Sequence, residues 1–328
     1  MRLNDVADDV GVSPATVSLV LRGIAGPSAA TRERVLEAAA RLGYRPDRLA
    51  SALASRRSRT VGVLMDISNA YQGRLVLDLY DAAERDGYKL VLSTLNRRHD
   101  EARAIEPLLD QRCEALVLFG PRGTKQFLDQ LGNELPVVVV GRAVPAGTVD
   151  VVRTADDDGV AEAVRHLAGL GHRRIAYVGG PAGTVTTFRR AGYETAMHDQ
   201  GFAEFVEFVD GGDVEQDGVR AAETMLRLGA PASGIIAFND RCALGLIDAL
   251  QRAGFDVPGA VSVIGFDDSP VSALPQVDLT TVAQDTRALA DAAMTSLVER
   301  LDLGRTNRRE VIVAPHLVVR GTTAAHRG

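Results

Sequence analysis

The fold of the N-terminal part of this chain is decided by residues 5–23, which read DVADDVGVSPATVSLVLRG. Apolar residues fall at helical spacing up to Gly11, a residue that can adopt the left-handed conformation at the end of a helix. Ser13 then offers an N-cap hydroxyl, and Pro14 suits the first position of a second helix. Two short helices joined by a tight turn have the spacing of a helix-turn-helix, whose second helix can lie in the major groove of DNA.

A third helix is predicted after Ser28, which provides a further N-cap, and it is expected to end at Gly43. Four apolar residues are expected to point inward from it: Val35, Leu36, Ala39 and Leu42. Because no strand pattern occurs in this region, the sequence predicts an all-α head over residues 1–45. By itself, a three-helix head is also compatible with a protein-interaction role or a purely structural one.

The charge is distributed unevenly along the 328 residues. The chain carries 37 Lys and Arg against 43 Asp and Glu, a net charge of -6. Residues 1–59 carry ten Arg against six acidic residues, a net of +4, so the remaining residues carry -10. A small basic head on a larger acidic body is the pattern expected when only the head contacts phosphates.

From Thr60 onward, short β-branched runs alternate with longer amphipathic segments, which marks a domain boundary. The predicted strands are Val61–Met65, Leu90–Ser93, Ala115–Phe119, Val137–Val140, Ile175–Val178, Gly234–Phe238 and Val261–Gly265. Helices are expected to begin near Gln72, Glu101, Asp157, Arg190, Asp217, Cys242 and Thr286. Because the strands are almost wholly apolar, they are buried on both faces, which indicates parallel sheets with crossover helices. So many units of this kind fit two doubly wound α/β lobes better than one.

Residues 46–59 connect the head to this body. Residues 46–55 can form one or two helical turns, which are marginal alone in water and would order only against a second chain or DNA. A flexible linker is the alternative. The basic run Arg56-Arg57-Ser58-Arg59 favours phosphate contacts, which add affinity without sequence information, over a solvated linker.

Several classes of protein lack support in the sequence. The N-terminus has no apolar signal-peptide core, and no stretch of about 18 apolar residues occurs, so we expect a cytoplasmic protein without a membrane segment. Cys113, Cys242 and the six His form no metal-ligand pattern, so no metal or cofactor is expected. No dinucleotide, P-loop or nucleophile-elbow motif points to an enzyme. A solute-binding protein without a DNA function is the more serious alternative.

The motifs together resemble the lac/gal repressor (LacI/GalR) family over almost the whole chain. In the head, the matching motifs are Thr16-Val17-Ser18, residues 28–35 and residues 43–50. In the body, they are residues 169–176, Gly179-Gly180-Pro181, residues 189–193, Asn239-Asp240, residues 261–268, residues 279–284 and residues 317–320. The resemblance implies a helix-turn-helix over residues 1–45, a hinge helix and linker over 46–59, and a two-lobed periplasmic-binding-protein-like domain over 60–328. It places the N-lobe at about 60–157 plus 286–313 and the C-lobe at about 158–285 plus 314–328.

The resemblance also implies which residues meet DNA. They are Ser13, Ala15, Thr16, Ser18, Leu19, Arg22, Arg48, Leu53 and Arg56. Leu19 occupies a base-reading position where the family often has Arg or His; it can contact a thymine methyl but cannot donate a hydrogen bond to guanine. Leu53 matches the hinge leucine that unstacks a central minor-groove step, and an ordinary interface leucine is the alternative.

For the effector, the resemblance points to a cleft between the lobes. The expected residues are Tyr71, Phe119, Arg189, Phe238, Asn239, Asp267 and Gln284. They fall near strand ends or lobe crossings, as expected for ligands of open α/β sheets, and an Arg, a carboxylate and amides together suit a polyhydroxyl ligand. Asp267 could instead be a turn residue and Asn239 a helix N-cap.

The expected function is therefore that of a ligand-responsive transcriptional regulator, with repression as the activity that the resemblance implies. Its expected partners are a pseudo-palindromic double-stranded DNA operator, a second copy of the chain and a small polar effector. A sugar is the favoured effector, and a nucleoside or another small metabolite is the alternative. Residues 321–328 show no apolar heptads, so assembly is expected to stop at a homodimer.

Overall fold

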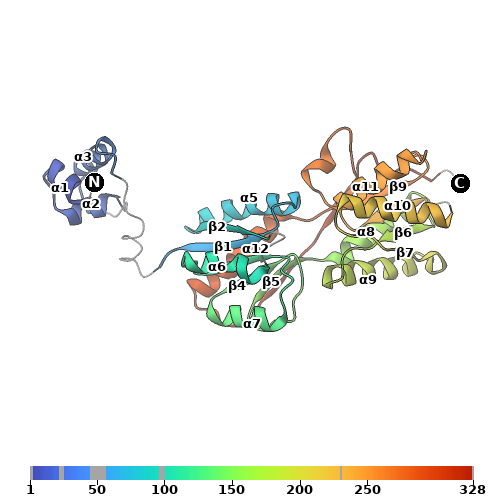
Figure 1. Cartoon of the computed structure of the whole chain (residues 1–328), viewed down its shortest axis with the longest axis horizontal. Helices are drawn as coiled ribbons and strands as arrows, with labels where there is room; N and C mark the ends of the chain where they lie inside the picture. The colour runs from blue at the N-terminus through green and yellow to red at the C-terminus, as the bar shows by residue number, and fades with distance from the viewer. Residues whose placement is uncertain (1–2, 22–25, 45–56, 96–99, 230, 327–328) are drawn as a thin grey trace. The chain divides into compact units, whose positions relative to one another are not determined.

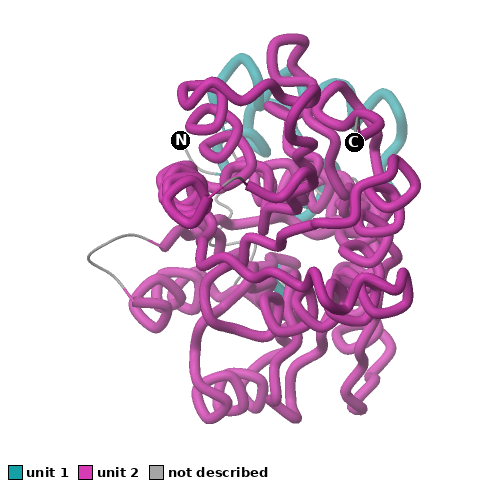
Figure 2. Tube along the Cα trace, turned by 90° about the vertical axis from the view of Figure 1, so that its right-hand side faces the viewer, with its two compact units in different colours: residues 1–58 teal, residues 59–328 magenta. Residues whose placement is uncertain are grey.

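The computed structural model describes residues 3–21, 26–44, 57–95, 100–229 and 231–326. The chain divides into two compact units, residues 1–58 and residues 59–328, which are coloured separately in Figure 2. Among the described residues, no helix is long and apolar enough to cross a membrane.

The first unit consists of three helices packed around one small core. They are α1 (Leu3–Val10), α2 (Pro14–Leu21) and α3 (Ala29–Arg41). Gly11 and Gly43 have φ of 72° and 63°, which confirms the left-handed helix ends. The prediction that Leu36 points inward is wrong, because 48% of its surface is exposed and Ala38 is buried instead. Residues 35, 38, 39 and 42 share one helical face, and residue 36 lies beside it.

The second unit contains two six-stranded sheets, each with its own helices (Figure 1). The first sheet is wholly parallel and has the order β11-β5-β4-β3-β1-β2. Its strands are β1 (Thr60–Met65), β2 (Lys89–Thr94), β3 (Ala115–Phe119), β4 (Val137–Val140), β5 (Asp150–Thr154) and β11 (Glu310–Val313). Helices α5 (Ala70–Arg85) and α12 (Thr286–Leu301) cover one face, and α6 (Glu101–Asp110) and α7 (Lys125–Glu134) cover the other. Burial on both faces explains why β1, β3 and β4 read as unbroken apolar runs.

The second sheet has the order β12-β10-β9-β8-β6-β7 and is parallel except for β12, which runs antiparallel to β10. Its strands are β6 (Ile175–Val178), β7 (Glu207–Val209), β8 (Gly234–Ala237), β9 (Ser262–Asp267), β10 (Thr281–Ala283) and β12 (His316–Val318). Helices α8 (Asp156–Gly169) and α9 (Thr184–Asp199) cover one face, and α10 (Glu215–Leu228) and α11 (Asp240–Arg252) cover the other. The predicted α/β class with parallel sheets is confirmed.

The chain passes between the two sheets after β5, after β10 and after β11. We call the first sheet with its helices the N-lobe and the second sheet with its helices the C-lobe. Each parallel sheet presents the carboxyl ends of its strands along one edge, where ligands of such sheets bind. A site is therefore expected among the residues that follow β1, β3, β8 and β9.

Candidate functional sites

A cavity of about 190 Å³ lies where the carboxyl ends of strands from both lobes meet, and we call it the central cavity. It gathers six of the seven residues expected to bind an effector: Tyr71, Phe119, Arg189, Phe238, Asn239 and Asp267. Tyr71 and Phe119 come from the N-lobe and the others from the C-lobe. Residues that are far apart in the sequence are thus brought to one polar and aromatic cavity.

Arg189 is the most firmly held of these residues. Its guanidinium lies over the ring of Phe266, 3.4 Å from the ring centre, and 4.8 Å from the ring centre of Phe238. Its Nε donates to Asp156 Oδ1 at 2.7 Å, and Nη1 donates to the Phe238 carbonyl. Both side chains of the Arg189–Asp156 pair are buried. No hydrogen bond within the described residues uses Arg189 Nη2, so this nitrogen has donor capacity left for a ligand.

Asp267 ends β9 with φ of 115°, a conformation that a residue with a side chain rarely adopts. Its Oδ1 accepts a hydrogen bond of 2.7 Å from Gln284 Nε2, and no hydrogen bond within the described residues uses Oδ2. Burial raises the pKa of Asp267 to about 7, against the opposing effect of the Arg189 charge. Gln284 does not line the central cavity; its Oε1 accepts from Thr154 Oγ1 at 2.6 Å, so it holds Asp267 in place.

Asn239 and Tyr71 differ in how far the protein already satisfies them. Asn239 is the N-cap of α11: its Oδ1 accepts from the Cys242 N–H at 2.9 Å, and its Nδ2 donates to the Asp213 carbonyl at 3.0 Å. It therefore lines the cavity with one N–H left to offer. The hydroxyl of Tyr71 is buried without a hydrogen-bond partner, and burial raises its pKa well above the usual value.

Two residues that support the cavity were not among those predicted from the sequence. Asp156 opens an acidic triplet in the first turn of α8, a position where acids ordinarily stabilise the helix end. Phe266 lies within an apolar strand and reads as core. Only the fold shows that one pairs with Arg189 and that the other supports its guanidinium.

The rim of the central cavity carries contacts between the lobes. Arg74 of α5 donates from Nη1 to the Asp268 carbonyl at 3.2 Å, and Arg122 Nη2 lies 3.8 Å from Asp213 Oδ2. Thr184 Oγ1 donates to the Ala143 carbonyl at 3.0 Å. These three contacts join the N-lobe to the C-lobe.

In the first unit, α2 presents the residues expected to face DNA. Ser13 Oγ accepts from the Thr16 N–H at 3.1 Å, which starts the helix, and Val17 and Val20 point into the core. Ser13 and Ala15 are exposed, and Thr16, Ser18 and Leu19 are partly exposed. The expected DNA contacts Arg22, Arg48, Leu53 and Arg56 lie outside the described residues.

Cys113 and Cys242 are free and buried, and burial raises their pKa to about 11 and about 12 respectively. Thiols of this kind are unreactive, because the thiolate is the nucleophile. No group of His, Cys, Asp and Glu within the described parts of the chain is arranged to hold a metal ion.

A helix-turn-helix and a two-lobed ligand-binding body define a ligand-responsive transcriptional regulator. Residues 2–47 match the family described as bacterial regulatory proteins of the lacI family, and residues 164–323 match the periplasmic binding protein-like domain. The HTH-type transcriptional regulator GalS of Salmonella typhimurium is 35% identical over 297 residues, which cover 89% of this chain and 87% of the relative. The chain belongs to the LacI family of bacterial regulatory proteins.

Solved structures of family members agree along the full length. The lac repressor dimer bound to operator and to the anti-inducer ONPF superposes with a TM-score of 0.84 at 28% identity, covering 99% of each chain. A complex of the transcriptional regulator CelR with cellobiose gives a TM-score of 0.72 at 28% identity, covering 98% of this chain and 99% of that chain.

Proposed function

We propose that this chain is a repressor that binds a pseudo-palindromic operator as a homodimer and changes its affinity for DNA when a sugar occupies the central cavity. The observation that carries the proposal is the convergence of Arg189, Asp267 and Tyr71 on one cavity of a chain that also bears a helix-turn-helix. No catalytic step is assigned to the cavity. A regulator of this kind acts in the cytoplasm, where the bacterial chromosome lies.

The free hydrogen-bonding groups of the central cavity suit a polyhydroxyl ligand. Arg189 Nη2 and Asn239 Nδ2 supply donors, Asp267 Oδ2 supplies an acceptor, and the Tyr71 hydroxyl supplies either. A sugar hydroxyl can both donate and accept hydrogen bonds, so adjacent hydroxyls of a sugar can pair with a mixed set of donors and acceptors such as this one. Phe119 and Phe238 provide apolar surface for the faces of a sugar ring. The cellobiose bound to CelR shows that a relative of the same fold takes a sugar.

For DNA, the exposed side of α2 would enter the major groove with Ala15, Thr16, Ser18 and Leu19 toward the bases. One three-helix head makes few base contacts, so two heads on half-sites about one helical turn apart are needed for specificity. We assign Leu53 to the central minor-groove step. Arg22, Arg48 and Arg56 are the remaining residues assigned to DNA.

The same proposal assigns roles to segments of the chain. Residues 1–45 form the DNA-binding domain, residues 46–59 the hinge helix and linker, and residues 60–328 the effector-binding and dimerisation domain. Within the last, residues of about 60–157 with 286–313 form the N-lobe, and residues of about 158–285 with 314–328 form the C-lobe. Helix α8, which begins at Asp156, belongs to the C-lobe.

Two measurements on the full-length protein test the function. A thermal-shift screen of sugars and nucleosides should give stabilisation by a sugar, because a ligand that binds only the native state raises its stability. Selection from a random duplex pool, with and without that sugar, should return a two-fold-related sequence whose binding weakens steeply with salt. A chain that selects no sequence in any ligand state is not a DNA-binding regulator, and stabilisation by nucleosides alone would reassign the effector.

A further inference from the structure

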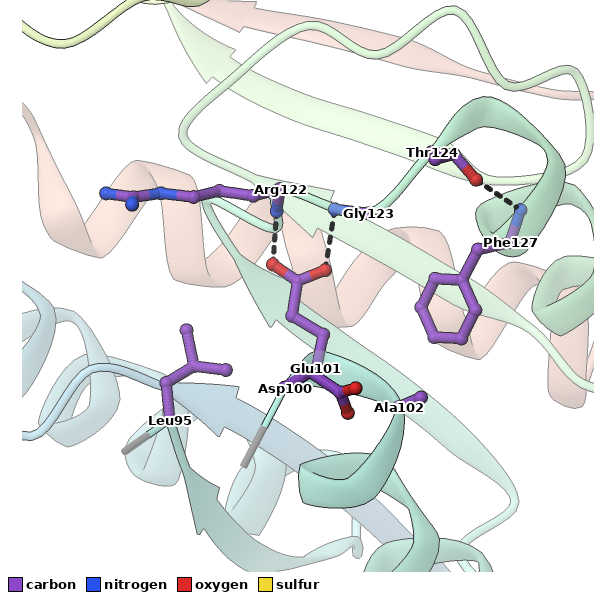
Figure 3. Close-up of a pocket in the computed structure, with 8 residues that line it drawn as sticks. All are labelled: Leu95, Asp100, Glu101, Ala102, Arg122, Gly123, Thr124 and Phe127. Atoms are coloured by element: carbon purple, nitrogen blue, oxygen red, sulfur yellow. Dashed lines mark hydrogen bonds between the residues drawn. The ribbon is translucent and has the colours of Figure 1, made fainter. Parts of the chain in front are cut away.

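A second and larger pocket, shown in Figure 3, lies on the N-lobe and shares the lining residue Arg122 with the central cavity. It has a volume of about 490 Å³ and lies between Leu95 after β2, the first turn of α6 and the first turn of α7. Leu95, Ala102 and Phe127 give it an apolar lining. We call it the side pocket.

The polar groups around the side pocket are already paired with one another. Glu101 accepts hydrogen bonds from the backbone N–H groups of Arg122 and Gly123, the latter at 2.6 Å, as Figure 3 shows. Asp100 caps α6 and Thr124 caps α7, each accepting from the third residue of its helix. With both helix ends capped by side chains, the pocket offers apolar surface and not an anion site.

The position of Phe127 in the side pocket depends on Gly123. A Cβ at Gly123 would lie 2.7 Å from the Phe127 ring and 2.9 Å from the Glu101 carboxylate. A residue without a side chain therefore allows the ring and the carboxylate to approach the loop together. Residues of α6, α7 and the loop that follows β3 therefore pack closely against one another at the side pocket.

Arg122 joins the side pocket to the central cavity. It lines both, and its side chain, 77% exposed, runs away from Phe127 (Figure 3) toward Asp213 on the C-lobe. A ligand lying in the central cavity would therefore meet the side pocket at Arg122.

An unsatisfied donor lies near the same junction. Arg142 follows Gly141, which lines the central cavity, and its Nε is buried without a hydrogen-bond partner. Burial lowers the pKa of Arg142, against the raising effect of the Glu101 charge. A buried donor without an acceptor is costly. Arg142 lines neither pocket, so this donor is not assigned to the ligand.

The volumes indicate how large the ligand is. Cavities for small molecules are usually roughly 300–1,000 Å³. The central cavity, at about 190 Å³, falls below this range, and the two pockets together fall within it. We infer that the side pocket is a second subsite of the effector, which is a disaccharide or an aryl glycoside whose second ring lies against Leu95 and Phe127. This inference rests on the proposed sugar-sensing function.

Isothermal titration of the full-length protein tests the inference with matched probes. Glucose, galactose, mannose and ribose would each be compared as the free sugar, the methyl glycoside, the phenyl glycoside and a disaccharide. Two-ring probes of the recognised sugar should bind at least tenfold more tightly than its methyl glycoside, because only they bury a ring in the side pocket. The phenyl and disaccharide arms separate an aglycone from a second sugar.

Two variants test whether the tighter binding of two-ring probes depends on the side pocket. Ala102→Phe fills the side pocket from an exposed position in the first turn of α6, and Phe127→Ala removes its aromatic wall. Both should reduce the affinity for the two-ring probe about tenfold and leave the affinity for the methyl glycoside unchanged. Leu303→Ala, at an exposed residue outside both pockets, is the control.

The outcomes separate the inference from the function on which it rests. If free sugars and two-ring probes bind within threefold of each other, or if Ala102→Phe leaves the preference intact, the subsite is wrong and sugar sensing stands. If no sugar in any form binds, the proposed effector class fails and the subsite fails with it. Because Ala102→Phe removes no core contact, a folding defect in Phe127→Ala would leave the test decisive.

Discussion

Replacing Asp267 with Asn should separate the charge of this residue from its shape. Asn keeps the size of the side chain and can still accept the hydrogen bond from Gln284 Nε2, which is 2.7 Å long in the native protein. The substitution changes Oδ2, the acceptor that has no partner among the described residues. A hydrogen bond to a charged acceptor contributes about 1.5–3 kcal/mol, so the Kd for the sugar should rise roughly 10- to 150-fold at pH 8.

The pH dependence of the sugar affinity is a second quantitative prediction for Asp267. Burial raises the pKa of Asp267 to about 7, and a ligand hydroxyl that donates to it requires the ionised form. Protonation below pH 7 therefore competes with the ligand, and the native affinity should fall about tenfold between pH 8 and pH 6. The affinity of Asp267→Asn should be independent of pH over this range, because Asn does not titrate.

Asp267→Asn should weaken sugar binding but stabilise the unliganded protein. The pKa of Asp267 in the folded state lies above the value of about 4 for an unfolded chain, so ionisation opposes folding. The stabilising contribution of protonated Asp267 to the free energy of unfolding is lost as the pH rises from about 4 to 7. Asp267→Asn should therefore raise the Tm at pH 8.

Isothermal titration at pH 6, 7 and 8, together with thermal unfolding, measures all three effects. The probe is the sugar that stabilises the native protein most in the screen, and Asp110→Asn, at an exposed position on α6, is the matched control. A Kd for Asp267→Asn within threefold of the native value at pH 8 would refute the assignment of Asp267 as a ligand acceptor. A native affinity that does not change with pH would show that the carboxylate is not the group that the ligand meets.

Three further predictions concern stability, operator binding and assembly. Asp150→Asn should lower the free energy of unfolding in urea by about 3 kcal/mol, because the buried carboxylate accepts from Arg300 Nε at 2.8 Å and Arg305 Nη2 at 2.6 Å; Asp248→Asn, at an exposed position, should cost less than about 1 kcal/mol. Leu53→Ala should weaken operator binding in a gel-shift titration and leave sugar affinity and subunit mass unchanged; an unaltered operator affinity would reduce Leu53 to linker packing. Light scattering of the free protein at micromolar concentration should give a dimer, and either a monomer or a stable tetramer would contradict the proposed assembly.

Much of the fold could be predicted because its strands are unbroken apolar runs. All seven predicted strands occur, and their ends differ from the predicted ends by no more than two residues. The strands that were missed, β5, β7, β10, β11 and β12, have five residues or fewer, and their apolar runs are at most three residues long. β5 shows the reason: it begins with Asp150, whose charge looks unlike a strand until Arg300 and Arg305 are brought to it.

Helix starts were predictable where a capping residue marked them and less so elsewhere. Helix α12 begins at the predicted Thr286, behind the capping Asp285. Helix α9 was expected near Arg190 and begins at Thr184, where the N-cap is Gly183 and no side chain caps the helix. Helix α7 was not predicted, although Thr124 caps it, because its short apolar face is interrupted by polar residues.

The candidate site could be predicted as a set of residues but not as a geometry. Its members follow strand ends, which the sequence pattern identifies. The role of each residue depends on the contacts that it makes in the fold. Gln284 positions Asp267 from outside the cavity, and Asn239 uses most of its hydrogen-bonding groups at the N-terminus of α11. The Asn239 cap was an alternative that the local pattern offered. Gln284 lies 17 residues from Asp267 and Asp213 lies 26 residues from Asn239, so local patterns carry no information about these two pairs.

The backbone at the end of β9 suggests how a ligand in the central cavity is linked to the lobes. Asp267 and Asp268 both have positive φ, 115° and 48°, a strained arrangement that persists only where surrounding contacts enforce it. Those contacts come from both lobes: Arg320 of the C-lobe donates to Asp268 Oδ1 at 2.6 Å, and Arg74 of α5 in the N-lobe donates to the Asp268 carbonyl at 3.2 Å. The residue proposed to accept the sugar is therefore one peptide unit from a residue that ties the lobes together. A ligand that changes the conformation of Asp267 must also change the free energy of that tie, which is the differential interaction that a ligand-controlled change in lobe closure requires.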